Sequence, residues 1–337
     1  MSERKVYDKP FLSPLALVTE YLPRKGLLVN VTSEEKEFAT SVLSQINWYK
    51  LKIYFYPFLD REKNNQDQDQ DQEMYIKEVN FEFGLNLYRL DEEIRNLLIK
   101  YLLPIEIISN TIIDQSITEW TKDSFWYLDD AYFSQNTPIH ERAKINDSLL
   151  KESKAESNHN FSRHYLNKYS SPCKSYRNLP PFWIANELIS FDVFLNLLDK
   201  LNYQAFDKDG ENCLDLAARK IGVNSFKDLK NWLAAFKDAR NKACHSNRVW
   251  NTWLKTPRGI VNYDGLGDKN NLKENTIYLI FTAIKIVYNK NRWHASNMSL
   301  KDDLSEIINR YKNKVGSVDL EREMYFPNNW GDLEVWS

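Results

Sequence analysis

The sequence predicts an all-α protein. The 337-residue chain contains only 9 glycines and 11 prolines, which suits long helices and argues against a sandwich, a barrel or a glycine-looped nucleotide-binding fold. Apolar residues recur at steps of three and four along several long segments, which is the spacing of amphipathic helices. With 42% hydrophobic and 14% aromatic residues, the chain is rich enough to bury a sizeable core.

Residues 1–84 predict an N-terminal helical extension. A first helix is indicated by the apolar spacing of Leu15, Val18 and Leu22, and a second helix opens near Thr32. The aromatic run 48–56 predicts either a helix end or a short strand. Residues 61–73 contain an Asp-Gln repeat that cannot pack, so they predict a polar insertion.

Residues 85–337 predict a helical core that forms one unit with the extension. Helical spacing runs from 85 to 117, with a bend or junction expected at Pro104. Residues 134–181 are polar and predict a surface excursion. Three more helices are expected at 182–201, from Ser225 to about His245, and at about 272–289, and Ser225 starts the second of these with a capping-box pattern.

The composition narrows the class of protein. The charged N-terminus is followed by no apolar signal core, and the longest strongly apolar run, 277–284, is too short to span a bilayer. We therefore expect a cytoplasmic protein with no membrane partner. The three cysteines are widely spaced and no histidine cluster has metal-ligand spacing, so we expect no disulfide framework, no metal site and no cofactor.

An arginine interrupts the apolar stripe of the helix that follows Ser225. The stripe Phe226, Leu229, Leu233 and Phe236 continues onto Arg240. An unpaired guanidinium at the edge of a buried stripe would cost several kcal/mol, so Arg240 must be paired or turned toward a cleft. It therefore calls for an anion. His245, five residues on, is the side-chain type that moves protons near neutral pH.

The same region combines basic and aromatic residues. Residues 237–258 contain six basic side chains and one acid, interleaved with Trp250 and Trp253. Basic groups beside aromatic faces are typical of single-stranded RNA recognition, and a solvated helix face with core tryptophans is the alternative. The candidate RNA-binding residues are Lys242, Arg248, Trp250 and Asn251.

Arg240, Asn241 and His245 could cleave RNA without a metal ion. The reaction needs a base for the 2′-hydroxyl, an acid for the leaving 5′-oxygen and a cation for the phosphate. His245 can act as base or acid, Arg240 clamps the phosphate, and Asn241 orients the ring or binds the same phosphate. The alternative is that Arg240 and His245 only cap and charge-balance the helix end.

One helix supplies one histidine, yet the reaction has two proton-transfer roles. Arg240 and His245 also lie roughly 140° apart on an ideal helix. A two-fold homodimer that brings two motifs together would supply the missing groups.

Glu187 lies within an otherwise apolar helix face. We expect its partner to be a basic residue of the motif helix, either Arg240 or Arg248, which Glu187 would hold in place. The alternative is an exposed glutamate beside the core face.

These landmarks together resemble the Abi family of abortive-infection proteins, of the AbiD/AbiF type, whose core belongs to the HEPN superfamily of helical ribonucleases. The matching pieces are Lys9-Pro10, Arg24-Lys25-Gly26-Leu27, Trp48-Tyr49-Lys50-Leu51, Ile105-Glu106-Ile107, Pro181-Phe182-Trp183 with Glu187 and Ser190-Phe191, Arg240-Asn241 to His245 with Arg248 to Asn251, and Phe326-Pro327 to Trp330. The chain departs from the family at Asn110, where an arginine is common, and at 66–72, which resembles an insertion.

The resemblance implies a HEPN-type helical bundle, a homodimer with the Arg-x4-His motifs at its interface, and a role in phage defence. It also implies a small structured RNA as a regulatory or antitoxin partner in some members. The predicted function is a metal-independent endoribonuclease that acts as a toxin-like abortive-infection effector on RNA. The alternative is a non-catalytic RNA-binding module of the same fold that holds a small structured RNA.

Overall fold

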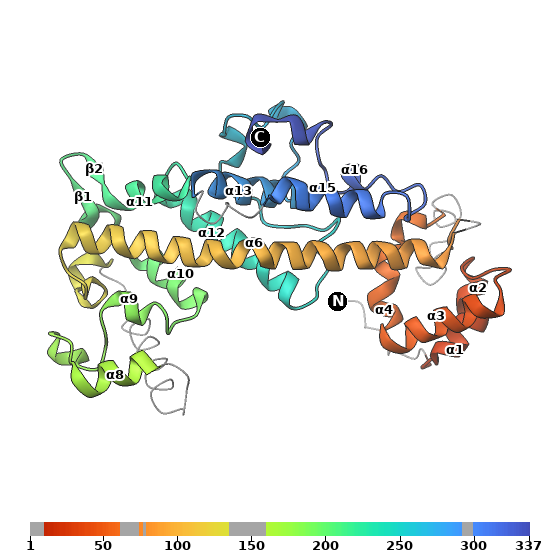
Figure 1. The fold of residues 1–337 in the computed structure, drawn as a ribbon, viewed down its shortest axis with the longest axis horizontal. Helices are drawn as coiled ribbons and strands as arrows, with labels where there is room; N and C mark the ends of the chain where they lie inside the picture. The colour runs from red at the N-terminus through yellow and green to blue at the C-terminus, as the bar shows by residue number, and fades with distance from the viewer. Residues whose placement is uncertain (1–9, 61–73, 77–78, 135–159, 292–298) are drawn as a thin grey trace, which may run out of the picture. The chain divides into compact units, whose positions relative to one another are not determined.

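The computed structural model describes residues 10–60, 74–76, 79–134, 160–291 and 299–337 (Figure 1). The predicted all-α fold is confirmed, since the described residues form helices and a single two-stranded sheet. The predicted polar insertion 61–73 lies outside the described residues, as does most of the predicted excursion 134–181.

The chain divides into two compact units. Unit 1 comprises residues 1–94 and 304–323, and unit 2 comprises residues 95–303 and 324–337. Helix α6 (Phe81–Thr121) contributes to both units, so this division falls inside a helix. A core beginning at residue 85 stays a prediction.

Besides its parts of α6 and of the helix at 300–311, unit 1 is built of shorter helical elements. The helix predicted to open near Thr32 begins there with a capping box, because the Thr32 hydroxyl accepts a hydrogen bond from the Glu35 amide (3.2 Å) and Glu35 accepts one from the Thr32 amide (2.7 Å). The aromatic run is helical and forms no strand. The elements are α1 (Pro14–Ala16), a π-helical turn (Leu17–Tyr21), α2 (Leu22–Arg24), α3 (Ser33–Gln45), α4 (Trp48–Leu51), a 3-10 helix (Lys52–Phe58) and α16 (Leu320–Glu323).

Close packing in unit 1 explains a glycine within a helix. A Cβ atom at Gly84 would lie 2.4 Å from the ring of Phe55, so only glycine lets α6 approach the aromatic cluster. The buried Asp91 accepts a hydrogen bond from the hydroxyl of Tyr54 (2.7 Å), which satisfies a carboxylate that would otherwise be costly to bury.

Helix α6 runs through Pro104 without interruption, so Pro104 is not a junction. Its 41 residues include an apolar window long enough to cross a membrane, judged by length and composition alone. Leu98, Leu102 and Ile105 are buried in that helix, as is typical of a core helix in a folded domain.

Unit 2 contains most of the remaining α-helices. They are α8 (Asn160–Lys168), α9 (Phe182–Ala185), α10 (Phe191–Lys200), α11 (Cys213–Ile221), α12 (Phe226–Cys244), α13 (Ile277–Lys290) and α15 (Leu300–Tyr311), which also extends into unit 1. A hairpin pairs β1 (Asp207–Lys208) with β2 (Glu211–Asn212) in antiparallel register. Its turn, Asp209-Gly210, has positive φ at both residues, as a type I′ turn requires.

Two predicted helices differ from the observed ones. The helix expected at 182–201 is two helices, because the chain turns after Ala185 and the Ser190 side chain caps a new helix at the Val193 amide. Trp183, in the first of these two helices, is 51% exposed. The helix expected from residue 272 begins at Ile277.

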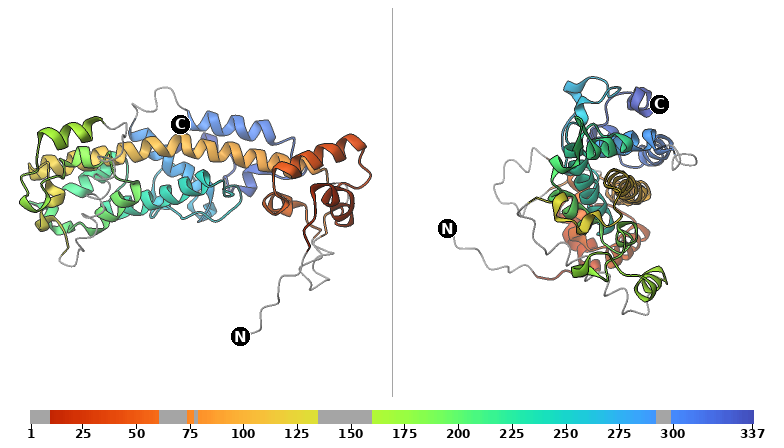
Figure 2. Two further views of the ribbon diagram at one scale, coloured as in Figure 1. Left: turned by 90° about the horizontal axis from the view of Figure 1, so that it is seen from below. Right: turned by 90° about the vertical axis from the view of Figure 1, so that its left-hand side faces the viewer.

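Helix α12 forms as predicted. The Ser225 hydroxyl accepts a hydrogen bond from the Asp228 amide (3.2 Å), the apolar stripe is buried, and α12 contacts α10, α11 and α13. Figures 1 and 2 show the backbones of these helices. These contacts fix the end of α12, where the candidate site lies.

Candidate functional site

A Schellman turn ends α12 at the predicted motif. Ser246 adopts a left-handed backbone conformation (φ 54°), the Ser246 amide donates to the Ala243 carbonyl (3.1 Å), and the Asn247 amide donates to the Lys242 carbonyl (2.9 Å). His245 therefore follows the last helical residue, and its amide donates to the Asn241 carbonyl (3.0 Å). Its side chain is exposed to solvent.

Arg240 is paired, as its place in the apolar stripe requires, and its partner is Glu106 of α6. The Nε atom of Arg240 lies 3.0 Å from Oε1 of Glu106, and the two side chains are 23% and 18% exposed. The Nε atom is itself buried, and the contact is an ion pair without the alignment of a straight hydrogen bond. No described residue accepts a hydrogen bond from the two terminal nitrogens of Arg240.

Opposing effects act on the pKa of the Glu106 carboxyl. Burial raises the pKa of its carboxyl, the Arg240 charge lowers it, and Asp192 raises it further, with a net upward shift. Asp192, in the first turn of α10, forms an ion pair with Lys237 of α12. The described residues thus place two acids and two bases at the contact of α6, α10 and α12.

Glu187 does not hold Arg240, which corrects the expected pairing. Glu187 lies exposed after α9, and no described residue forms an ion pair with it. Glu106 belongs to the Ile105-Glu106-Ile107 piece of the family resemblance. The spacing of residues along the sequence did not indicate that Glu106 pairs with Arg240, which lies 134 positions away. Asn110, one turn after Glu106, keeps a buried side-chain oxygen that no described residue hydrogen-bonds.

Trp250 is a core residue and cannot stack on a base. Its side chain is fully buried, as is that of Trp232, whose indole donates to the Arg258 carbonyl (2.8 Å). Trp253 is 62% exposed. The alternative, that the tryptophans lie in the core, is therefore correct for Trp232 and Trp250 and wrong for Trp253.

The candidate RNA-binding residues that remain are partly engaged within the protein. The ammonium of Lys242 lies 3.3 Å from an Asp238 carboxylate oxygen, donates to the Trp253 carbonyl (2.8 Å) and lies 5.5 Å from the centre of the Trp253 ring. Arg248 and Asn251 are half-buried in the segment after α12, and Asn251 has positive φ (43°). Asn241 is half-buried on α12, one turn before His245.

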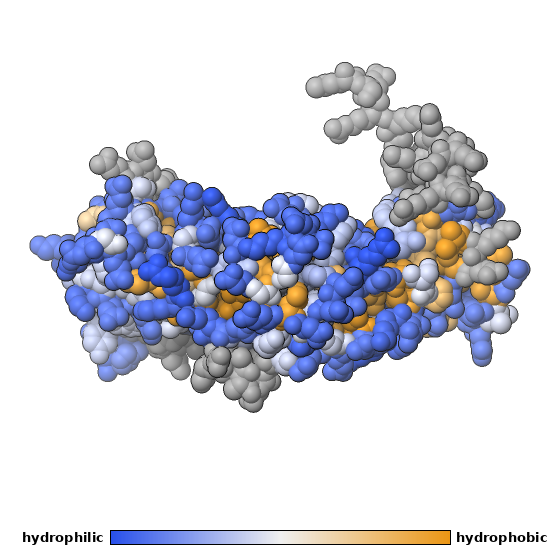
Figure 3. All heavy atoms as spheres, turned by 90° about the horizontal axis from the view of Figure 1, so that it is seen from above, coloured by the Kyte–Doolittle hydropathy of each residue, from blue (hydrophilic) through white to orange (hydrophobic). Residues whose placement is uncertain are grey.

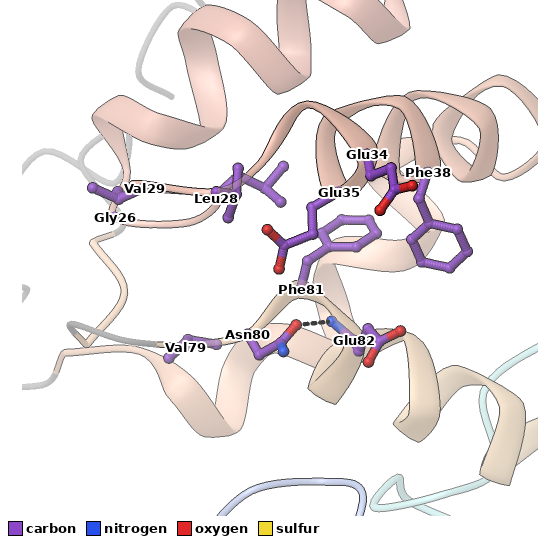
Figure 4. Close-up of a pocket in the computed structure, with 11 residues that line it drawn as sticks. Gly26, Leu28, Val29, Glu34, Glu35, Phe38, Val79, Asn80, Phe81 and Glu82 are labelled. Atoms are coloured by element: carbon purple, nitrogen blue, oxygen red, sulfur yellow. Dashed lines mark hydrogen bonds between the residues drawn. The ribbon is translucent and has the colours of Figure 1, made fainter.

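A pocket of about 430 Å³ lies within unit 1 (Figure 4). It is lined by the segment after α2, the start of α3 and the start of α6, where the Glu82 amide donates to the Asn80 side chain (2.8 Å). None of the predicted site residues lines it. Across the described ranges, no three or more His, Cys, Asp or Glu side chains are grouped to hold a metal ion.

The chain matches one known family over most of its length. The model of the family described as Abi-like protein matches residues 41–251, which include Glu106, Arg240 and His245. No curated protein and no solved structure matches the chain. The family match covers well over half of the 337 residues and ends just after the motif. The chain therefore belongs to the Abi-like protein family, which suggests a role in abortive infection and phage defence.

Proposed function

We propose that this protein is a metal-independent endoribonuclease that acts as an abortive-infection effector and uses Arg240, Asn241 and His245. The arrangement of Arg240 is the observation that carries the proposal. Glu106 lies against the Nε atom of Arg240, while the terminal nitrogens of Arg240 form no hydrogen bond with a described residue. A guanidinium anchored at one edge presents its other edge to a phosphate, and His245 is exposed five residues later.

The chemistry follows from these two side chains. A neutral histidine removes the proton of the 2′-hydroxyl, and the oxygen attacks the adjacent phosphorus. The bond to the 5′-oxygen breaks, that oxygen takes a proton from a second acid, and a 2′,3′-cyclic phosphate remains. Arg240 stabilises the negative charge that builds on the phosphate oxygens in the transition state. Asn241 binds the same phosphate or orients the ring.

A homodimer supplies the second acid in this proposal. Each α12 carries one histidine, so the partner's motif is needed across a two-fold axis. Two exposed apolar side chains of α6, Leu103 and Ile107, lie beside Glu106 at helical steps of three and one. An exposed apolar stripe beside an ionic site is suited to self-association. Figure 3 shows one face on which apolar side chains reach the surface between hydrophilic ones.

The remaining residues have supporting roles in the proposal. Glu106 positions Arg240 and touches no substrate. Lys242 and Arg248 are the candidates for contact with neighbouring phosphates, and Trp250 leaves the RNA-binding set because it is buried. The proposal also includes kinship with the HEPN superfamily and a cytoplasmic location.

The test is RNA cleavage by the purified full chain in the presence of EDTA. We expect 2′,3′-cyclic or 3′-phosphate ends. His245→Ala should lose activity by about 100-fold or more with little change in RNA affinity, and Arg240→Ala should lose both, because arginine also neutralises the bound phosphate. Glu187→Gln is the matched control and should cleave like the parent.

Three outcomes would overturn the proposal. Strict dependence on a divalent ion, or products with 3′-hydroxyl ends, would exclude the mechanism. RNA binding by all variants without cleavage by any of them would favour the alternative, a non-catalytic RNA-binding module that holds a small structured RNA.

A further inference from the structure

A second cavity, of about 340 Å³, lies within unit 2 between α6 and α11. Ser116 and Trp120 reach it from α6, where they lie one turn apart. Cys213 and Lys220 reach it from α11, and Lys208 reaches it from the β1–β2 hairpin. The cavity is thus built by three elements that the fold holds together, and it includes no residue of the Arg240 motif.

Two lysines give this cavity a positive charge. The ammonium of Lys220 donates to the hydroxyl of Ser116 (3.3 Å), a residue only 7% exposed, and this contact fixes the position of the charge. Lys208 is exposed on the hairpin. Glu119 is the one acidic residue of the lining, so two positive charges face one negative charge. A cavity with this balance favours an anion.

Trp120 gives the cavity an aromatic wall. Its side chain is half-buried, and no described residue stacks on its ring or accepts a hydrogen bond from its indole. It therefore differs from Trp232 and Trp250, which are buried in the core, and from Trp253, whose ring lies near the Lys242 ammonium. Basic groups beside an aromatic face, which the sequence suggested at residues 237–258, occur here in accessible form.

We propose that this cavity binds a nucleoside monophosphate, with the base against Trp120 and the phosphate between Lys208 and Lys220. Any nucleobase can stack on an indole ring, because every base has a planar aromatic face. A phosphate needs cations at hydrogen-bonding distance. The volume is at the small end of ligand pockets, which suits one nucleotide rather than an oligonucleotide. The carboxylate of Glu119 can accept hydrogen bonds from ribose hydroxyls or a base amino group.

In this proposal the cavity binds the nucleotide without forming a covalent bond to it. Burial raises the pKa of the Cys213 thiol to about 12, so it stays protonated and adds no negative charge that would repel a phosphate. The nucleotide can be free or can be the phosphorylated end of an RNA, and the two sources share the same recognition chemistry.

Binding can be measured by calorimetry and ligand-observed NMR on the full chain. We use the His245→Ala background, so that the result does not depend on RNA cleavage. The probes are AMP, GMP, CMP, UMP, adenosine and inorganic phosphate. Trp120→Leu should weaken nucleotide binding by about tenfold, and Trp120→Phe should restore most of it. Lys208→Gln and Lys220→Gln should each weaken binding by about five- to tenfold. Lys227→Gln, which changes an exposed lysine of α12 outside the lining, should have no effect.

A 5′-phosphorylated and a 5′-hydroxyl oligonucleotide distinguish the two sources of the ligand. If only the phosphorylated oligonucleotide displaces the bound monophosphate, the ligand is an RNA end. If neither oligonucleotide displaces it, the ligand is a free nucleotide. The proposal is overturned if no monophosphate binds at up to about 5 mM. It is also overturned if the Trp120 and lysine variants bind like the parent, or if inorganic phosphate binds as tightly as a nucleotide.

Discussion

Changing Glu106 to glutamine separates stability from activity at the Arg240 site. The substitution keeps the size of the side chain and removes its charge. At 3.0 Å the attraction between the two charges is about 5.5 kcal/mol with an effective dielectric of about 20. The substitution also recovers the several kcal/mol that burial of the Glu106 carboxylate costs, while Arg240 stays buried and charged, so the lost attraction and the recovered desolvation nearly cancel. The raised pKa of Glu106 agrees with this balance, because it shows that the burial of the carboxyl outweighs the attraction of Arg240.

We therefore expect Glu106→Gln to change the free energy of unfolding by no more than about 1 kcal/mol at neutral pH. Its RNA-cleaving kcat/KM should nevertheless fall by about 10- to 100-fold, because the guanidinium loses the contact that orients it. Urea unfolding and cleavage assays on the same preparation measure both quantities. Glu187→Gln should change neither.

The pH dependence of stability gives a second readout of the same variant. A raised carboxyl pKa means that the folded protein binds the proton more tightly than the unfolded chain. The contribution of Glu106 to stability is therefore present at low pH. It is lost as the pH rises from the ordinary value of 4.5 through the raised pKa. Glu106→Gln should lack this part of the decline.

The reasoning is refuted if Glu106→Gln loses more than about 3 kcal/mol of stability, which would make the ion pair a structural element. Cleavage at the parental rate would refute it equally, because Glu106 would then position nothing.

Two further predictions concern the dimer and the core. An excess of inactive His245→Ala protomers mixed with wild type should suppress cleavage beyond simple dilution, and Leu103→Glu with Ile107→Glu should shift the protein to monomer in light scattering; an active monomer would refute the shared site. Trp250→Ala should lower the free energy of unfolding by about 3–5 kcal/mol because it empties a fully buried volume. Trp253→Ala, at an exposed position, is the control. If Trp250→Ala reduced RNA affinity and left stability unchanged, the assignment of Trp250 to the core would be contradicted.

The sequence predicted the local features of this fold better than its long-range ones. Ser225 and Thr32 predicted their helix starts correctly, because a cap is a contact between residues three apart. The turn before Ser190 was missed, since apolar spacing alone reads 182–201 as one helix.

The candidate site shows the same limit. The placement of Arg240 in an apolar stripe correctly predicted that it has an anionic partner, but the identity of that partner depends on how α6 packs on α12. Glu187 was the wrong choice because its own turn carries it to the surface. Trp250 looked like an RNA contact because periodicity does not reveal whether an aromatic residue after a helix folds back into the core.

Phosphate groups commonly bind at the amino ends of helices, where amides point outward. Arg240 and His245 lie at the carboxyl end of α12, where the partial charge is negative. The Schellman turn engages the carbonyls of Asn241, Lys242 and Ala243 with amides of the chain itself, which removes three acceptors from the path of an incoming anion. An RNA phosphate bound there would be held by side-chain charges against the field of the helix. In the proposed mechanism the transition state carries more negative charge than the phosphodiester, so Arg240 would stabilise the transition state more than the bound substrate.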